Sequence, residues 1–171
     1  MDRTIPDRRL NVGLCWAGGP LHRNDANRST RFADWLPLLW LPIRLHSLQV
    51  GDRADDWKEY EWVATGGAKM EWAKGDFVTP LLGVEDWADT AGVIAGLDLV
   101  ITVDTAVLHL AGGMGIPVWG LLAAAPDFRW GLVHDRSPWY PSLTLYRQPR
   151  AGTWAEVIGR VLTDLEHQCA K

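Results

Sequence analysis

The stretch LDLVITVDTAVLHLAGGMGIPVWGLL, residues 97–122, decides the fold of this chain. Residues 97–103 are almost wholly apolar and rich in β-branched side chains, which is the pattern of a central parallel strand buried on both faces. Small, helix-compatible residues follow at 105–114, and residues 116–122 form a second apolar run. The stretch therefore predicts a strand, a helix and a second strand in succession.

The same alternation extends to both sides of this stretch. Apolar runs and periodicity predict further strands at residues 11–17, 43–49, 77–82 and 143–147, and helices at 34–40, 86–95 and 154–167. Asp34 is expected to cap the first helix with Pro37 in its first turn, and Thr153 and Glu156 form a capping-box pattern before the last. Residues 53–75 show no clear period and are interpreted as irregular, with room for a helical turn. We therefore predict a single Rossmann-like α/β domain with a mostly parallel sheet.

The composition limits the classes of function. A chain of 171 residues, 47% hydrophobic and 22% charged, fits one soluble domain, which we place at 11–167 between tails 1–10 and 168–171. The net charge of −4 argues against a nucleic-acid-binding protein. No apolar run reaches the roughly 20 residues that span a membrane. Cys15 and Cys169 lack ligand-like or disulfide-like spacing and the five histidines are scattered, so we expect no metal, no cofactor and a cytoplasmic location.

The turn that follows residues 97–103 carries the strongest signal for a ligand site. Asp104 and Thr105 stand where the strand stops and the helix starts. A side-chain oxygen there can cap the helix while free backbone N–H groups face the crevice, and such a helix start suits a phosphate. His109 lies one helical turn further on the same face as Thr105. It either donates to a phosphate or sugar oxygen or is a structural histidine of the core, and spacing leaves both interpretations open.

Further candidate ligand-binding residues follow the other strands: Trp16, Gly18, Arg28, Ser29, Gln49 and Arg129. The loop with Arg28 and Ser29 offers donors for an anionic ligand, although such a composition is more often that of a solvated loop. Arg129, beside Trp130, can clasp a nucleotide base or simply take part in packing. The GxxxxGK[ST] and GxGxxG patterns are both absent, which disfavours ATPase and dehydrogenase interpretations.

Seven segments together resemble a known family of glycosyltransferases. They are GLCWAGGP (13–20), NRST (27–30), SLQVGD (47–52), the stretch 97–122 quoted above, FRW (128–130), SPWYPSLTLYRQ (137–148) and TWAEVI (153–158). Over about residues 11–165, the chain is similar to the C-terminal domain of family 9 glycosyltransferases, those related to the ADP-heptose:lipopolysaccharide heptosyltransferases. It is more similar still to the version of this domain found in bacterial tetratricopeptide-repeat proteins.

The resemblance implies the donor-binding half of a GT-B glycosyltransferase, with a nucleotide-diphospho-sugar lying against the glycine-rich and DT…H segments. Two departures from the family stand out. Ala106 occupies a position where heptosyltransferases have glycine, and the N-terminal acceptor domain, where they are thought to hold the catalytic base, is not found in this chain. The resemblance thus implies that transfer depends on an acceptor domain or on a tetratricopeptide-repeat domain as partner.

The leading hypothesis is therefore a nucleotide-diphospho-sugar-binding domain of a glycosyltransferase, inactive without an acceptor domain, whose catalytic residues are unknown. Asp104 and Thr105 would hold the diphosphate, Trp16, Arg28 and Ser29 would line the first loop, and Gln49 and His109 would reach the sugar or phosphates. The alternative is a non-catalytic protein-interaction module that retains the fold, with the eleven tryptophans marking an interface. A nucleotide-sugar epimerase is less favoured because it also needs two domains. Whether the chain alone is an enzyme stays open.

Overall fold

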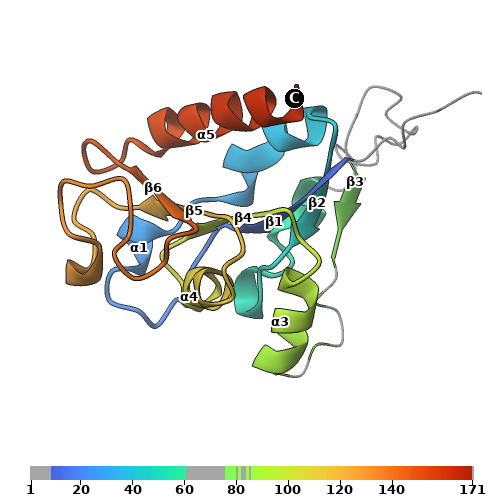
Figure 1. Ribbon diagram of the computed structural model, residues 1–171, viewed down its shortest axis with the longest axis horizontal. Helices are drawn as coiled ribbons and strands as arrows, with labels where there is room; N and C mark the ends of the chain where they lie inside the picture. Colours follow the sequence, from blue (N-terminus) through green and yellow to red (C-terminus); the bar gives the residue numbers. More distant parts are fainter. Residues whose placement is uncertain (1–8, 61–75, 80, 82–83, 85, 171) are drawn as a thin grey trace, which may run out of the picture.

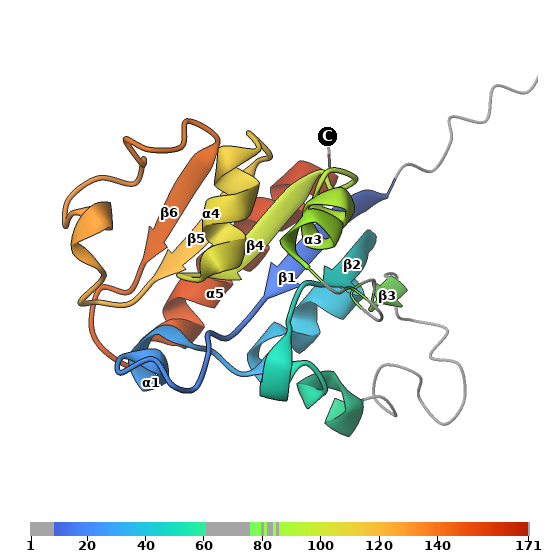
Figure 2. The same ribbon diagram turned by 90° about the horizontal axis from the view of Figure 1, so that it is seen from below.

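Strand β4 (Leu99–Val103) lies in the interior of a six-stranded sheet whose strands all run parallel (Figures 1 and 2). The computed structural model describes residues 9–60, 76–79, 81, 84 and 86–170. The sheet order is β3-β2-β1-β4-β5-β6. The other strands are β1 (Leu10–Cys15), β2 (Ile43–Ser47), β3 (Asp76–Val78), β5 (Val118–Leu122) and β6 (Leu143–Arg147). The predicted α/β domain with a mostly parallel sheet is confirmed.

Helices cover both faces of this sheet, as Figure 1 shows. Helices α3 (Trp87–Ile94) and α4 (Ala106–Gly113) lie on one face. The long helix α5 (Trp154–Cys169) and the 3-10 helix η1 (Phe32–Trp40) lie on the other. The remaining helices are short: α1 (Asp25–Arg28), η2 (Gly51–Arg53), η3 (Asp56–Tyr60) and η4 (Phe128–Trp130).

Alternate side chains of β4 pack into the two hydrophobic clusters, one on each face of the sheet. Leu99, Ile101 and Val103 belong to the cluster that η1 and α5 complete, whereas Val100 belongs to the cluster beneath α3 and α4. Every residue of β4 is buried. This is why the strand reads as an unbroken apolar run rather than as an alternating one.

The segment predicted as a helix from residue 34 differs from expectation. Helix η1 starts at Phe32 and has 3-10 geometry, so Asp34 lies inside its first turn, where its Oδ2 accepts a hydrogen bond from the Arg31 N–H at 3.0 Å. Pro37 lies in the interior of η1 rather than in its first turn. Because proline has no N–H, it interrupts α-helical bonding in the middle of the segment.

Three other local expectations were wrong or only partly right. The Thr153 side chain does not cap α5, because its hydroxyl donates to the carbonyl of Arg150 at 2.7 Å. Helix α1 lies in a segment for which no helix was expected. Helix η3 falls in the stretch 53–75, where the sequence allowed a helical turn, and η2 ends at the first residue of that stretch. The strand expected at 77–82 shortens to β3. The parts of these expectations that fall on residues 1–8, 61–75, 80, 82–83 and 171 lie outside the described residues.

The connections that follow the adjacent strands β1 and β4 cross to opposite faces of the sheet. The chain leaves β1 toward η1 on one face and leaves β4 toward α4 on the other (Figure 1). Parallel sheets open a crevice beyond the carboxyl ends of two such strands, because the connections diverge there. The topology therefore places a ligand site between the segments that follow β1 and β4.

Candidate functional site

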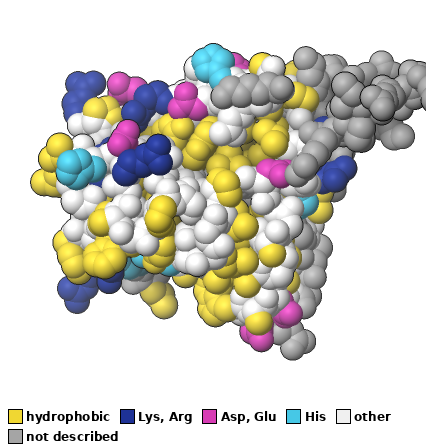
Figure 3. Space-filling view, viewed as in Figure 1, with side chains coloured by type: hydrophobic (Ala, Val, Ile, Leu, Met, Phe, Trp, Pro, Cys, Tyr) yellow, Lys and Arg dark blue, Asp and Glu magenta, His cyan; other side chains and the backbone are white. Residues whose placement is uncertain are grey.

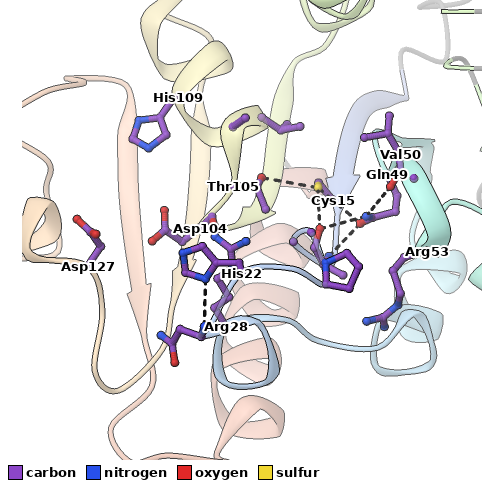
Figure 4. Close-up of a pocket in the computed structure, with 18 of the residues that line it drawn as sticks. Cys15, His22, Arg28, Gln49, Val50, Arg53, Asp104, Thr105, His109 and Asp127 are labelled. Atoms are coloured by element: carbon purple, nitrogen blue, oxygen red, sulfur yellow. Dashed lines mark hydrogen bonds between the residues drawn. The ribbon is translucent and has the colours of Figure 1, made fainter.

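A pocket of about 730 Å³ occupies this position at the carboxyl edge of the sheet (Figure 4). Its walls come from the segments after β1, β2, β4 and β5 and from the first residue of α3. Among the residues expected from the sequence, the following line it: Gly18, Arg28, Gln49, Asp104, Thr105, His109 and Arg129. Trp16 and Ser29 lie outside the lining.

Arg28 is fixed in the wall of the pocket by α1. Its Nη1 donates to the main-chain carbonyl of Asp104 at 2.8 Å, and its Nε lies 3.5 Å from Asp25 Oδ1. Gly18 packs directly on the guanidinium group, and a Cβ at this position would overlap it, which explains the glycine. Ser29 supports this arrangement from behind, because its Oγ accepts from the Gly18 N–H at 2.9 Å and donates to Asp25 Oδ1 at 2.8 Å.

The start of α4 forms the opposite wall. Thr105 is extended (φ −137°, ψ 174°), and neither it nor Asp104 caps the helix with a side-chain oxygen, which corrects the expectation from the sequence. Instead, Thr105 Oγ1 lies 3.1 Å from Thr102 Oγ1 and 3.8 Å from Cys15 Sγ. Within the described part of the chain, the N–H groups of Ala106 and Val107 have no hydrogen-bond acceptor. The positive end of the helix dipole is therefore available to an anion.

Gln49 joins the ends of β1 and β2 beneath the pocket. Its Oε1 accepts from the N–H groups of Trp16 (3.1 Å) and Ala17 (2.9 Å), and its Nε2 donates to the carbonyls of Ala17 (3.1 Å) and Val50 (3.3 Å). The side chain is buried, and both ends of its amide are bonded to main chain. Gln49 therefore forms part of the base of the pocket. The sequence had led us to expect that its side chain would contact a sugar or a phosphate.

Trp16 lies behind the wall rather than in it. The indole is fully buried, its Nε1 donates to Asp56 Oδ2 at 3.0 Å, and its ring meets Phe32 edge-on at 5.0 Å. The same Asp56 oxygen accepts from Nε of Arg53 at 2.7 Å, and Arg53 does line the pocket. Trp16 thus contributes to the packing that supports Arg53, a residue that the sequence did not single out.

His109 has features of both a pocket residue and a structural histidine, the two interpretations that the sequence left open. It lines the pocket, and one side of the imidazole is held by protein: Nδ1 lies 3.0 Å from the Tyr140 hydroxyl, and the ring stacks on Trp130 at 5.3 Å and 23°. The imidazole, Asp104 and Asp127 all line this pocket (Figure 4). The side chain is therefore both anchored in the fold and present at the cavity.

Arg129 stands at the rim and is half exposed. Its Nη1 pairs with Asp127 Oδ1 at 2.9 Å, and its guanidinium lies 5.1 Å from the Phe128 ring centroid. Both Arg129 and Asp127 line the pocket. The rim on the β5 side therefore offers a cation and a carboxylate side by side.

The pocket also contains residues that sequence reasoning did not assign to it. They are Cys15, His22, Arg53, Trp87 and Asp127. Burial raises the pKa of the Cys15 thiol, so this group is a neutral part of the floor at neutral pH. The available signal was position, because Cys15 ends β1, Trp87 begins α3 and Asp127 precedes η4 at the same edge.

No group of three or more His, Cys, Asp or Glu side chains among the described residues is arranged to hold a metal ion. No helix in the described part combines the length and apolar character needed to cross a membrane.

The chain is similar to a known protein family and to a curated protein. The family described as Glycosyltransferase family 9 (heptosyltransferase) matches residues 59–156, more than half of the chain. The chain is also similar to Protein FlbA of Caulobacter vibrioides, at 31% identity over 166 aligned residues that cover 90% of this chain and 24% of FlbA. It therefore spans about a quarter of the length of this relative. No solved structure matches.

Proposed function

Because the chain belongs to glycosyltransferase family 9, we propose that its pocket is the donor site of a glycosyl-transfer reaction and binds a nucleoside-diphosphate sugar. The observation that carries this proposal is the pairing of Arg28 with the start of α4 inside one cavity. A guanidinium group and a free helix N-terminus are two independent features that favour a phosphate, and they converge on the same space.

The diphosphate is assigned to the N–H groups of Ala106 and Val107 and to Arg28. These donors are held before the ligand arrives, since α4 is part of the core and Arg28 is tied to Asp104. In glycosyl transfer the diphosphate leaves with negative charge, and positioned donors stabilise that charge without reorganising. The alanine at position 106 keeps the N–H that this role requires.

The carboxylate of Asp104 has a different role in this proposal. A carboxylate disfavours a neighbouring phosphate but accepts hydrogen bonds from hydroxyl groups. Asp104 and Asp127 both line the cavity (Figure 4). We assign the sugar hydroxyls to these two carboxylates, with Arg129 at the rim.

Transfer itself is proposed to need a second wall, supplied by an acceptor domain or a tetratricopeptide-repeat domain. Holding both reactants together lowers a barrier by as much as about 7–11 kcal/mol, and a pocket in one domain holds only the donor. Large hydrophobic side chains are exposed near the carboxyl edge of the sheet: Leu21, Val50, Trp87, Phe128, Leu132, Val133 and Trp139. Figure 3 shows that hydrophobic side chains reach the surface in several places on the face that it views. Such a surface is typical of one that packs against another protein or domain.

The same surface favours a second candidate function, a protein-interaction module without donor binding. The two functions differ in whether the pocket binds a nucleotide. Calorimetric titration of the chain with ADP, UDP, GDP and their sugars decides between them. At tenfold excess over the dissociation constant, a bound ligand should raise Tm by about 3–6 °C for a domain of this size. No binding of any of these nucleotides at millimolar concentration would favour the interaction module.

The variant Ala106→Pro tests the phosphate site itself. Proline suits the first position of a helix, and the extended Thr105 before it is compatible with a following proline, so the fold is retained while one N–H is removed. The affinity for the nucleotide should fall roughly ten- to a hundredfold, the range expected for loss of a charge-assisted hydrogen bond. Ala106→Gly keeps the N–H and serves as the control. Unchanged affinity in a folded Ala106→Pro chain would contradict the assignment.

A further inference from the structure

The imidazole of His109 is enclosed on the side away from the pocket by the connection between β5 and β6. The Tyr140 hydroxyl lies 3.0 Å from Nδ1, the Trp130 ring stacks at 5.3 Å, and the Tyr140 ring meets the imidazole edge-on at 5.8 Å and 69°. Two aromatic contacts and one hydrogen bond therefore define both the plane and the rotation of the ring. Within the described residues, Nε2 has no hydrogen-bond partner.

His109 and the phosphate donors at the start of α4 line the same pocket. Side chains of an α-helix lean toward its N-terminus, so His109 covers the turn that begins at Ala106. Both His109 and Ala106 line the pocket. An imidazole N–H at this position adds a third kind of donor to the helix N-terminus and Arg28.

Tyr140 is itself seated by close packing on α4. A Cβ at Gly112 would lie 2.7 Å from Cγ of the Tyr140 ring, so the ring lies directly against the helix backbone. Ser137 Oγ accepts from the N–H of Tyr140 at 3.4 Å. The tyrosine is therefore held by α4 and by its own loop at once.

Arg147 anchors the part of the connection that carries Trp130. Its guanidinium donates to the carbonyls of Trp130 (2.6 Å), Gly131 (3.0 Å) and His134 (2.7 Å). A planar guanidinium that bonds three carbonyls fixes the loop in one arrangement. The stack of Trp130 on His109 is thereby part of a preassembled wall.

We propose that Tyr140 is a positioning residue of the ligand site, whose hydroxyl holds His109 so that Nε2–H donates to an oxygen of the ligand's diphosphate. This inference rests on the proposed function. When Tyr140 donates to Nδ1, the single proton of the neutral ring lies on Nε2. When the ring is protonated, Nδ1–H donates to the tyrosine oxygen and Nε2 keeps its proton. Both arrangements present a donor to the pocket.

A double-mutant cycle on nucleotide affinity tests this proposal. The variants are Tyr140→Phe, which retains the ring against Gly112, His109→Ala, and both together. The probe is whichever of ADP, UDP and GDP the wild-type chain binds most tightly in calorimetry. Tyr140→Phe alone should raise Kd about three- to tenfold, the range for one lost hydrogen bond. In the His109→Ala background the same change should leave Kd unaltered, because the hydroxyl acts through His109.

Tyr146→Phe is the matched control, since it deletes a tyrosine hydroxyl that bonds Asp164 Oδ2 at 2.7 Å on the α5 side of the sheet. It should leave Kd unchanged. NMR of ¹⁵N-histidine-labelled protein adds a direct readout: the wild-type chain should show His109 protonated on Nε2, and Tyr140→Phe should redistribute the proton between the two nitrogens.

An unchanged Kd in Tyr140→Phe, or an equal rise in Kd with and without His109, would overturn the role of Tyr140 and leave the donor site standing. A wild-type chain that binds none of the three nucleotides would overturn both.

Discussion

Arg28 Nη1 donates to the main-chain carbonyl of Asp104 at 2.8 Å, across 76 positions of sequence. This bond joins the loop after β1 to the turn after β4, the two segments that diverge at the carboxyl edge. The cation and the helix start are thus parts of one rigid assembly. The first prediction concerns this bond.

Arg28→Met should lower the affinity for a nucleoside diphosphate by at least about tenfold, because it removes a charge-assisted contact to phosphate. Calorimetry at low salt measures the change. Arg31→Met is the control, because Arg31 is a largely exposed arginine that pairs with Asp34 outside the pocket. Equal affinities of the two variants would contradict a phosphate role for Arg28.

Gln49→Ala should destabilise the chain more than Gln148→Ala. Gln49 satisfies two main-chain N–H groups, whereas Gln148 satisfies one, that of Ala124 at 3.2 Å, and its own Nε2 has no partner among the described residues. Each buried N–H left without an acceptor costs roughly 1–3 kcal/mol. Urea unfolding monitored by circular dichroism gives both free energies. A larger loss of unfolding free energy in Gln148→Ala would show that the hydrogen bonds of Gln49 do not stabilise the base of the pocket.

Two neighbouring glycines of α4 should respond in opposite directions to alanine. Gly112→Ala should cost about 1–3 kcal/mol of unfolding free energy, because the new methyl group overlaps the Tyr140 ring. Gly113→Ala meets nothing within 4 Å and should stabilise by roughly 0.4–1 kcal/mol through reduced freedom of the unfolded chain. Thermal unfolding of the pair is the measurement, and a loss of similar size in both variants would contradict the close approach.

His46 should make stability depend on mildly acidic pH. Desolvation by burial, and secondarily the charge of Arg44, lower the pKa of His46 from its usual 6.5. As pH falls below that value the unfolded chain takes up the proton first, so this contribution to stability is present above about pH 6.5 and declines below it. In His46→Gln the unfolding free energy should fall less between pH 7 and 5 than in wild type. An unaltered slope in His46→Gln would refute the assignment.

Local patterns were enough to predict the elements of the sheet. Residues 97–103 read as a strand buried on both faces, and β4 is buried at each of its residues. Asp86 was expected to begin a helix, and its Oδ1 accepts from the N–H groups of Ala88 and Asp89 at 2.8 and 3.0 Å. These features depend on side chains within a few positions of each other, so periodicity and capping chemistry report them directly.

The capping rules failed where a polar side chain could bond to another nearby main-chain group instead. Asp34 and Thr153 were expected to cap helices, yet Asp34 lies inside η1 and Thr153 bonds the carbonyl of Arg150. A short polar side chain has several backbone partners within reach, and the local pattern does not select among them.

The sequence by itself determined the succession of the six strands and the longer helices along the chain, the buried character of the central strand and the carboxyl-edge position of Asp104 and Thr105. Only the tertiary structure decided what the polar candidates do. Gln49 accepts main-chain hydrogen bonds from the residues that follow β1, and the buried Trp16 bonds Asp56. His109 is a pocket residue whose imidazole contacts a tyrosine 31 positions away. The reason is physical. Each segment that is buried on one or both faces shows this in the spacing of its own apolar residues. The partner of a polar atom, in contrast, is whichever atom the fold brings within about 3 Å, and that atom can be distant in sequence.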